Sequence, residues 1–179
     1  MIYIVSLIIA AFVLALDLIS KYLAVALDFN FVVIHELLKF KLAYNTGAAF
    51  GFLGDKDWAM AFFIIMTSIV LLGIIGYFVF KIIKKQKISK WLAVAFSLVF
   101  SGALGHYIDR IAFAKVRDFI FVFYNTDIFP AIFNVADIAL VVGVIMVCVY
   151  LLFLDKEAVF KKAKKEEVSD GKDDNCWWK

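Results

Sequence analysis

Four long apolar stretches divide the chain. They cover Met1 to about Val25, Trp58 to Phe80, Trp91 to Ile108 and about Ala131 to Leu154. Since a helix rises about 1.5 Å per residue, each stretch covers a hydrocarbon core of about 30 Å. The pattern predicts an all-α membrane protein with four transmembrane helices. It leaves two larger loops, at about 26–57 and 109–130.

Composition and charge support this class and predict an orientation. Hydrophobic residues make up 65% of the 179 residues and proline occurs once, unlike a soluble domain of this size. Lysines concentrate at 81–90 and at 156–165, so both segments are expected in the cytoplasm. We therefore expect cytoplasmic termini, a four-span domain at 1–155 and a charged cytoplasmic tail at 156–179. These lysines explain the net charge of +3, which requires no nucleic-acid partner.

The two larger loops carry patterns of their own. Lys39 to Tyr44 alternates polar and apolar residues, which predicts a short amphipathic strand. The small residues within 45–51 allow another backbone to approach closely. Aromatic side chains of the second loop suit the membrane interface, namely Phe119, Phe121, Phe123, Tyr124 and Phe129. We expect a small β-rich cradle and an interfacial aromatic loop, both extracytoplasmic.

Polar residues interrupt three of the four apolar stretches at helical spacing. Each group has members three or four residues apart: Asp17 with Lys21; His106 with Asp109 and Arg110; Asn134 with Asp137. Residues so spaced share one helix face, and a charge at membrane depth costs about 2.5 to 3.5 kcal/mol. The polar faces are therefore expected to turn inward and meet in one layer. For Asp17 and Lys21, a structural ion pair is favoured over a catalytic role.

Asp118 and Asp137 are the strongest candidates for chemistry. Two carboxyl groups a few ångströms apart cannot easily both ionise, so they share a proton. One then accepts a proton from water while the other donates to a carbonyl oxygen, and no cofactor is required. Two cysteines, Cys148 and Cys176, with two distant histidines predict neither a disulfide nor a metal site.

Five ordered blocks carry a resemblance to a known family. They are Asp17-Leu-Ile-Ser-Lys21, Asn45-Thr-Gly-Ala-Ala-Phe50, Ser101-Gly-Ala-Leu-Gly-His-Tyr-Ile-Asp-Arg110, Val116-Arg-Asp-Phe119 and Phe133-Asn-Val-Ala-Asp137. In order and spacing they resemble the motifs of bacterial lipoprotein signal peptidase, also called signal peptidase II, over roughly residues 10 to 150. The resemblance implies a membrane-embedded aspartyl endopeptidase. It would cut prolipoproteins on the amino side of a diacylglyceryl-modified cysteine.

The resemblance also implies roles for individual residues. It places the catalytic pair on Asp118 and Asp137. Matches to residues that hold substrate or inhibitor are Asn45, Arg110 and Asn134, and matches to supporting polar positions are Asp17, Lys21 and Asp109. His106 departs from the pattern, because the family usually has asparagine there, and we expect it to position its neighbours. The expected partners are lipidated precursors and membrane lipids. The protein is expected to be a monomer and to lie in the bacterial cytoplasmic membrane.

Other interpretations of the same residues stay open. Asp109 and Arg110 also fit the end of a span, with Arg110 extending to the lipid head groups. Gly102 and Gly105 fit close packing between helices. The alternative class is a small polar-lined transporter or proton-relay subunit, although the chain has no internal repeat and its polar groups cluster at one boundary. A non-catalytic scaffold is a third possibility, against which the presence of both aspartates argues.

Overall fold

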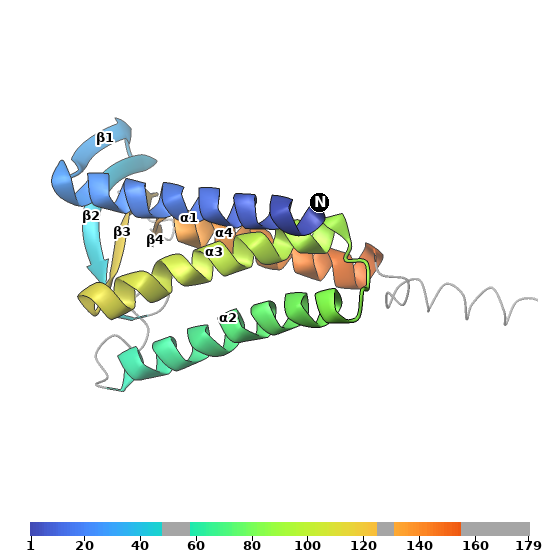
Figure 1. Ribbon diagram of the computed structural model, residues 1–179. Helices are drawn as coiled ribbons and strands as arrows, with labels where there is room; N and C mark the ends of the chain where they lie inside the picture. Colours follow the sequence, from blue (N-terminus) through green and yellow to red (C-terminus); the bar gives the residue numbers. More distant parts are fainter. Residues whose placement is uncertain (48–57, 125–130, 155–179) are drawn as a thin grey trace, which may run out of the picture.

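The protein is four long helices with a small sheet at one end of the bundle (Figure 1). A computed structural model describes residues 1–47, 58–124 and 131–154. The predicted tail at 156–179, most of the small-residue segment and Phe129 lie outside the described residues. All four helices are long and apolar enough to cross a membrane, as predicted.

The observed helices extend the predicted spans at some ends and shorten them at others. They are α1 (Ile2–Ala26), α2 (Ala59–Ile83), α3 (Lys90–Phe113) and α4 (Val135–Val149), the last continued by a π-helical turn, η2 (Tyr150–Leu154). The third span is expected to end in Asp109 and Arg110, but α3 continues for three more residues to Phe113. The fourth begins at Val135 and not near Ala131, because the preceding residues join the sheet.

Helix α3 is the central element. It packs against α1, α2 and α4. Over the most apolar 18 residues of each span, 56% of α3 is buried, against 11% in each of the others. Its buried face is rich in small residues, which let neighbouring backbones approach. A Cβ atom at Gly102 would lie 2.5 Å from the carbonyl oxygen of Ala136, so the predicted close packing at this glycine is confirmed.

The sheet has four antiparallel strands in the order β1-β2-β3-β4. They are β1 (Asn30–Ile34), β2 (Leu38–Asn45), β3 (Val116–Val122) and β4 (Ala131–Phe133). The predicted strand at 39–44 lies within β2. Strand β3 starts three residues after the last residue of α3, and β4 ends two residues before the first of α4. The sheet therefore holds the ends of two spans together.

An aromatic cluster joins the sheet to the adjoining end of α1. Phe40 stacks on Phe31 and on Phe119, at centroid distances of 5.4 and 6.3 Å. Phe29 meets Phe40 and Phe119 edge to face. The expected interfacial aromatic loop is therefore wrong for Phe119, which belongs to β3 and is only 3% exposed. Its ring is needed to bury one face of the sheet.

Candidate active site

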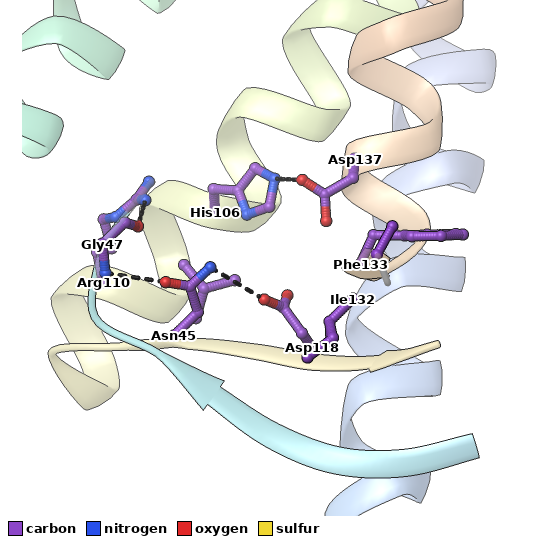
Figure 2. Close-up of a pocket in the computed structure, with 10 residues that line it drawn as sticks. Asn45, Gly47, His106, Arg110, Asp118, Ile132, Phe133 and Asp137 are labelled. Carbon is purple, nitrogen blue, oxygen red and sulfur yellow. Dashed lines mark hydrogen bonds and ion pairs between the residues drawn. The ribbon is translucent and has the colours of Figure 1, made fainter. Parts of the chain in front are cut away.

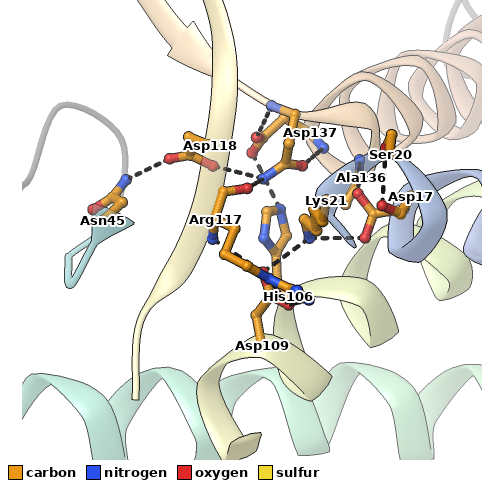
Figure 3. A network of polar contacts seen from close by, with 11 residues as sticks. Asp17, Ser20, Lys21, Asn45, His106, Asp109, Arg117, Asp118, Ala136 and Asp137 are labelled. Carbon is orange, nitrogen blue, oxygen red and sulfur yellow. Dashed lines mark hydrogen bonds and ion pairs between the residues drawn. The ribbon is translucent and has the colours of Figure 1, made fainter. Parts of the chain in front are cut away.

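A buried chain of ion pairs underlies the end of the bundle next to the sheet (Figure 3). The Nζ of Lys21 lies 2.7 Å from Oδ2 of Asp17 and 3.3 Å from Oδ2 of Asp109. Oδ1 of Asp109 in turn accepts from Nη2 of Arg117 at 2.6 Å. Asp17, Lys21 and Asp109 are all fully buried. The polar faces of α1 and α3 thus meet as predicted, and the expected Asp17–Lys21 ion pair is confirmed.

Arg117 is the member of this chain that sequence reasoning missed. Its guanidinium and its backbone N–H both donate to the Asp109 carboxylate, and its side chain stacks 4.4 Å from the ring centroid of Phe113. A signal was present, because Arg117 directly precedes Asp118 and strand neighbours point to opposite faces. The side chains of Arg117 and Asp118 therefore had to point to opposite faces of β3, where each contacts different residues. Asp109 is therefore a structural anchor between α3 and β3.

The start of α4 is fixed to α1 through the same network. Oδ1 of Asp17 accepts a hydrogen bond of 2.9 Å from the backbone N–H of Ala136. Gly105 of α3 lies against this contact, since an added Cβ would collide with Oδ2 of Asp17. Its interpretation as a packing position is confirmed. The first turn of α4, which carries Asp137, is consequently held at a defined depth.

Asn134 is the N-cap of α4. Its side-chain oxygen accepts from the backbone N–H of Asp137 at 3.1 Å. The backbone N–H of Asn134 donates back to Oδ2 of Asp137 at 2.9 Å, which completes a capping box. The sequence placed both residues inside the span, but Asn134 precedes it because the cap conformation is extended. The capping box fixes the direction in which the Asp137 carboxyl group points.

Asp118 reaches the same place from β3. Its Oδ1 accepts from Nδ2 of Asn134 at 2.6 Å, and its Oδ2 accepts from Nδ2 of Asn45 at 3.3 Å. The residue belongs to a strand and is only 3% exposed, so its carboxyl group is buried. Burial, and after it the neighbouring carboxylate of Asp137, raises the pKa of Asp118 above its ordinary value. Asn134 therefore contacts both Asp118, which belongs to β3, and Asp137, which belongs to α4.

His106 of α3 contacts the other oxygen of Asp137. Its Nε2 lies 3.1 Å from Oδ1 of Asp137. Its Nδ1 is buried and has no hydrogen-bond partner within the described part of the chain. Both oxygens of Asp137 thus have a hydrogen-bonding neighbour. His106 therefore lies beside Asp137, and its supporting role stays a prediction.

The two acids line one open cavity of about 250 Å³ (Figure 2). Its wall consists of Asn45, Gly47, His106, Arg110, Val116, Asp118, Ala131, Ile132, Phe133 and Asp137. Nη2 of Arg110 donates to the carbonyl oxygen of Gly47 at 3.1 Å, and its guanidinium lies 4.5 Å from the ring centroid of Phe63. Arg110 therefore lines the cavity, held by one hydrogen bond and one aromatic contact.

The structure brings all nine predicted site residues into one region, in two layers. Those that line the cavity are Asn45, His106, Arg110, Asp118 and Asp137, and those behind it are Asp17, Lys21, Asp109 and Asn134. Among the described residues, no three histidine, cysteine or acidic side chains lie close enough to hold a metal ion. The chemistry available in the cavity is that of two carboxyl groups beside an imidazole, a guanidinium and an amide.

Four candidate spans and a cavity that two carboxyl groups face are the parts that a membrane-embedded aspartic peptidase requires. Comparison with known proteins gives the family. The model of signal peptidase (SPase) II matches residues 9–153, so the chain belongs to the signal peptidase II family.

Individual relatives agree with this assignment. The chain is 39% identical over 166 residues to the lipoprotein signal peptidase of Staphylococcus aureus strain JH9, covering 89% of this chain and 93% of that one. A bacterial membrane enzyme solved by the in meso method at 2.3 Å superposes with a TM-score of 0.70 at 38% identity, over 83% of this chain and 87% of the other. A second, at 1.9 Å, gives a TM-score of 0.69 at 36% identity, over 83% and 93%.

Proposed function

We propose that this protein removes the signal peptide from prolipoproteins, cutting on the amino side of a diacylglyceryl-modified cysteine, with Asp118 and Asp137 as the catalytic pair. One observation carries the proposal. The two acids come from β3 and α4, line one cavity, and both contact Asn134. Family membership supplies the substrate class, and the relatives named lipoprotein signal peptidase support it. The alternative, a small polar-lined transporter or proton-relay subunit, has no comparable support.

Asp118 and Asp137 differ in their surroundings, and the difference suggests which acid donates a proton and which accepts one. Asp118 is buried, and burial raises its pKa, so we assign it the role of proton donor in the free site. The Asp137 side chain is 38% exposed and is the better placed of the two to contact a water molecule. Because the proton belongs to the pair, either acid can hold it at different stages.

The reaction then proceeds in two steps. Asp137 accepts a proton from water as the oxygen attacks the scissile carbonyl carbon, while Asp118 donates its proton to the carbonyl oxygen. In the second step the carbon–nitrogen bond breaks. Asp137 gives its proton to the leaving amine of the modified cysteine, and Asp118 takes back the proton of the intermediate's hydroxyl group. Both acids return to their starting states.

Other cavity residues are suited to holding the substrate. Arg110 carries a cationic fork that can bind a carbonyl or a lipid oxygen. Asn45 offers an amide beside Asp118, and β4 forms the apolar side of the cavity. A cavity at the end of the bundle lets water reach the acids while acyl chains stay among the spans. We propose that the protein acts as a monomer, because both acids and the polar side chains beside them come from one copy of the chain.

The test is cleavage of a diacylglyceryl-modified precursor by the purified full-length protein. We expect the modified precursor to be cut and the same precursor without the lipid to persist. Asp118→Asn and Asp137→Asn should each lower turnover by at least about 100-fold, the usual contribution of a positioned acid or base. The matched control is Asp28→Asn, an exposed acid beyond the end of α1. Retention of more than about a tenth of wild-type turnover in either variant would rule out the pair.

We further propose that the site faces the extracytoplasmic side of the bacterial cytoplasmic membrane. The lysines of 81–90 lie at the end of the bundle opposite the sheet, and their number favours the cytoplasm. With four spans, both termini and the tail at 156–179 are then cytoplasmic, and residues 1–155 form the membrane peptidase domain. In a background without Cys148 and Cys176, Gln86→Cys and Lys41→Cys should label from opposite sides. Labelling from the same side would contradict this orientation.

A further inference from the structure

A pocket of lysines lies at the end of the bundle away from the two acids. The connection from α2 to α3 runs past the amino terminus of α1 there (Figure 1). The pocket, about 420 Å³ in volume, is lined by four cationic side chains, Lys81, Lys85, Lys87 and Lys90. We call it the lysine pocket. None of the four is paired with a carboxylate of the described residues. Its concentrated positive charge favours an anion.

Hydrogen bonds give the lysine pocket a defined shape. The side-chain oxygen of Gln86 accepts a hydrogen bond from Nζ of Lys81 at 3.0 Å. The backbone carbonyl oxygen of Gln86 accepts one from the hydroxyl group of Tyr3 at 3.3 Å. Lys85 adopts a left-handed conformation, with φ of 50°, that turns the chain sharply after α2. The connection is thereby fastened to both α1 and α2. Lys85 and Lys87 are left exposed beside it.

An apolar groove continues from this pocket along the spans. It has a volume of about 210 Å³ and lies between α1, α2 and α3, where its wall includes Leu7, Phe78, Phe96 and Phe100. Tyr3 lines both the groove and the lysine pocket. Its ring meets that of Phe78 at 6.2 Å, edge to face. A charged cavity and an apolar groove thus share one wall, near the amino-terminal end of α1.

We propose that the lysine pocket and the groove together bind one anionic phospholipid. The phosphate head group lies among the lysines, and one acyl chain lies in the groove. Basic pockets between transmembrane helices have this chemistry, since each lysine near a phosphate adds attraction while the chain stays in an apolar environment. A soluble anion would use the lysine pocket alone, and a neutral lipid would use the groove alone. The shared wall at Tyr3 is what joins the two.

The test is native mass spectrometry of the full-length protein titrated with phosphatidylglycerol, phosphatidylcholine or glycerol phosphate. Phosphatidylglycerol should bind with a stoichiometry of one and more tightly than either of the others. Lys85→Gln combined with Lys87→Gln should weaken it about fivefold per lysine removed. The matched control is Lys39→Gln combined with Lys41→Gln, which removes two lysines from the sheet end. This control should leave the affinity unchanged.

A second variant tests the groove without altering charge. Ala10 lines the groove, and Ala10→Phe fills it. It should weaken phosphatidylglycerol binding at least about tenfold, roughly the effect of two lipid methylene groups taken out of contact. Ala61→Phe, at an exposed position of α2 near the sheet, is its control and should have no effect. Equal binding of both lipids, equal binding of glycerol phosphate, a lipid-free dimer, or unchanged affinity in the two test variants would each overturn the proposal.

Discussion

Nε2 of His106 lies 3.1 Å from Oδ1 of Asp137. The contact joins the one position that departs from the motif pattern to one of the two acids of the cavity. A histidine and an asparagine can both donate one hydrogen bond to a carboxylate. The geometry therefore fits a positioning role for His106.

The variant His106→Asn tests this positioning role. We expect it to keep at least about a tenth of wild-type precursor cleavage, since an asparagine can donate the same kind of hydrogen bond to Asp137. The measurement is turnover, with thermal stability as the folding control. If the variant were as inactive as Asp137→Asn while remaining folded, His106 would belong to the chemistry itself.

Asp118 should make the stability of the protein depend on pH. Its pKa is raised above the ordinary 3.8 by burial and then by the nearby Asp137 carboxylate. The native state therefore binds more protons than the unfolded state at pH values between 3.8 and the raised value. Wild-type stability should fall as pH rises through that window. Asp118→Asn has no such group, so the Tm difference between the two proteins should change as the pH rises above 3.8. Parallel Tm curves would contradict the raised pKa.

Lys21 should be a large contributor to stability. It lies between the carboxylates of Asp17 and Asp109, all of them fully buried. Removing one partner of a buried pair leaves an uncompensated charge, so Lys21→Met should cost about 3 to 5 kcal/mol. The measurement is Tm in detergent, with the exposed Lys84→Met as control. Adding Asp17→Asn to Lys21→Met should recover part of the loss, and strict additivity would show that the two side chains do not interact.

Gly105 and Gly76 offer a matched pair for testing helix packing near the site. A Cβ at Gly105 would collide with the Asp17 carboxylate and lie 3.3 Å from the Cβ of Ala136, whereas one at Gly76 would meet nothing within 4 Å. Gly105→Ala should therefore lower Tm and precursor cleavage together, because the start of α4 is displaced. Gly76→Ala should leave both unchanged or raise Tm slightly, since alanine favours a helix. Equal effects would show that Gly105 is not a contact point.

The sequence by itself determined the spans and the inward polar faces. A run of apolar residues of sufficient length crosses the membrane whatever its neighbours do, so α1 and α2 could be predicted to within a few residues. Helical spacing likewise puts Asp17 and Lys21 on one face without knowledge of other helices. The ordered motif blocks also indicated the family correctly.

Only the tertiary structure decided the partners of these residues. Asn134 reads as part of an apolar span, yet it directly follows β4 and caps α4, because β4 pairs with β3. The link from Asp109 to Arg117 depends on how α3 meets β3. Such contacts join residues from elements whose relative placement no local pattern specifies. A charged residue within an apolar span indicates that it needs a polar partner, but the packing of the elements decides which residue that partner is.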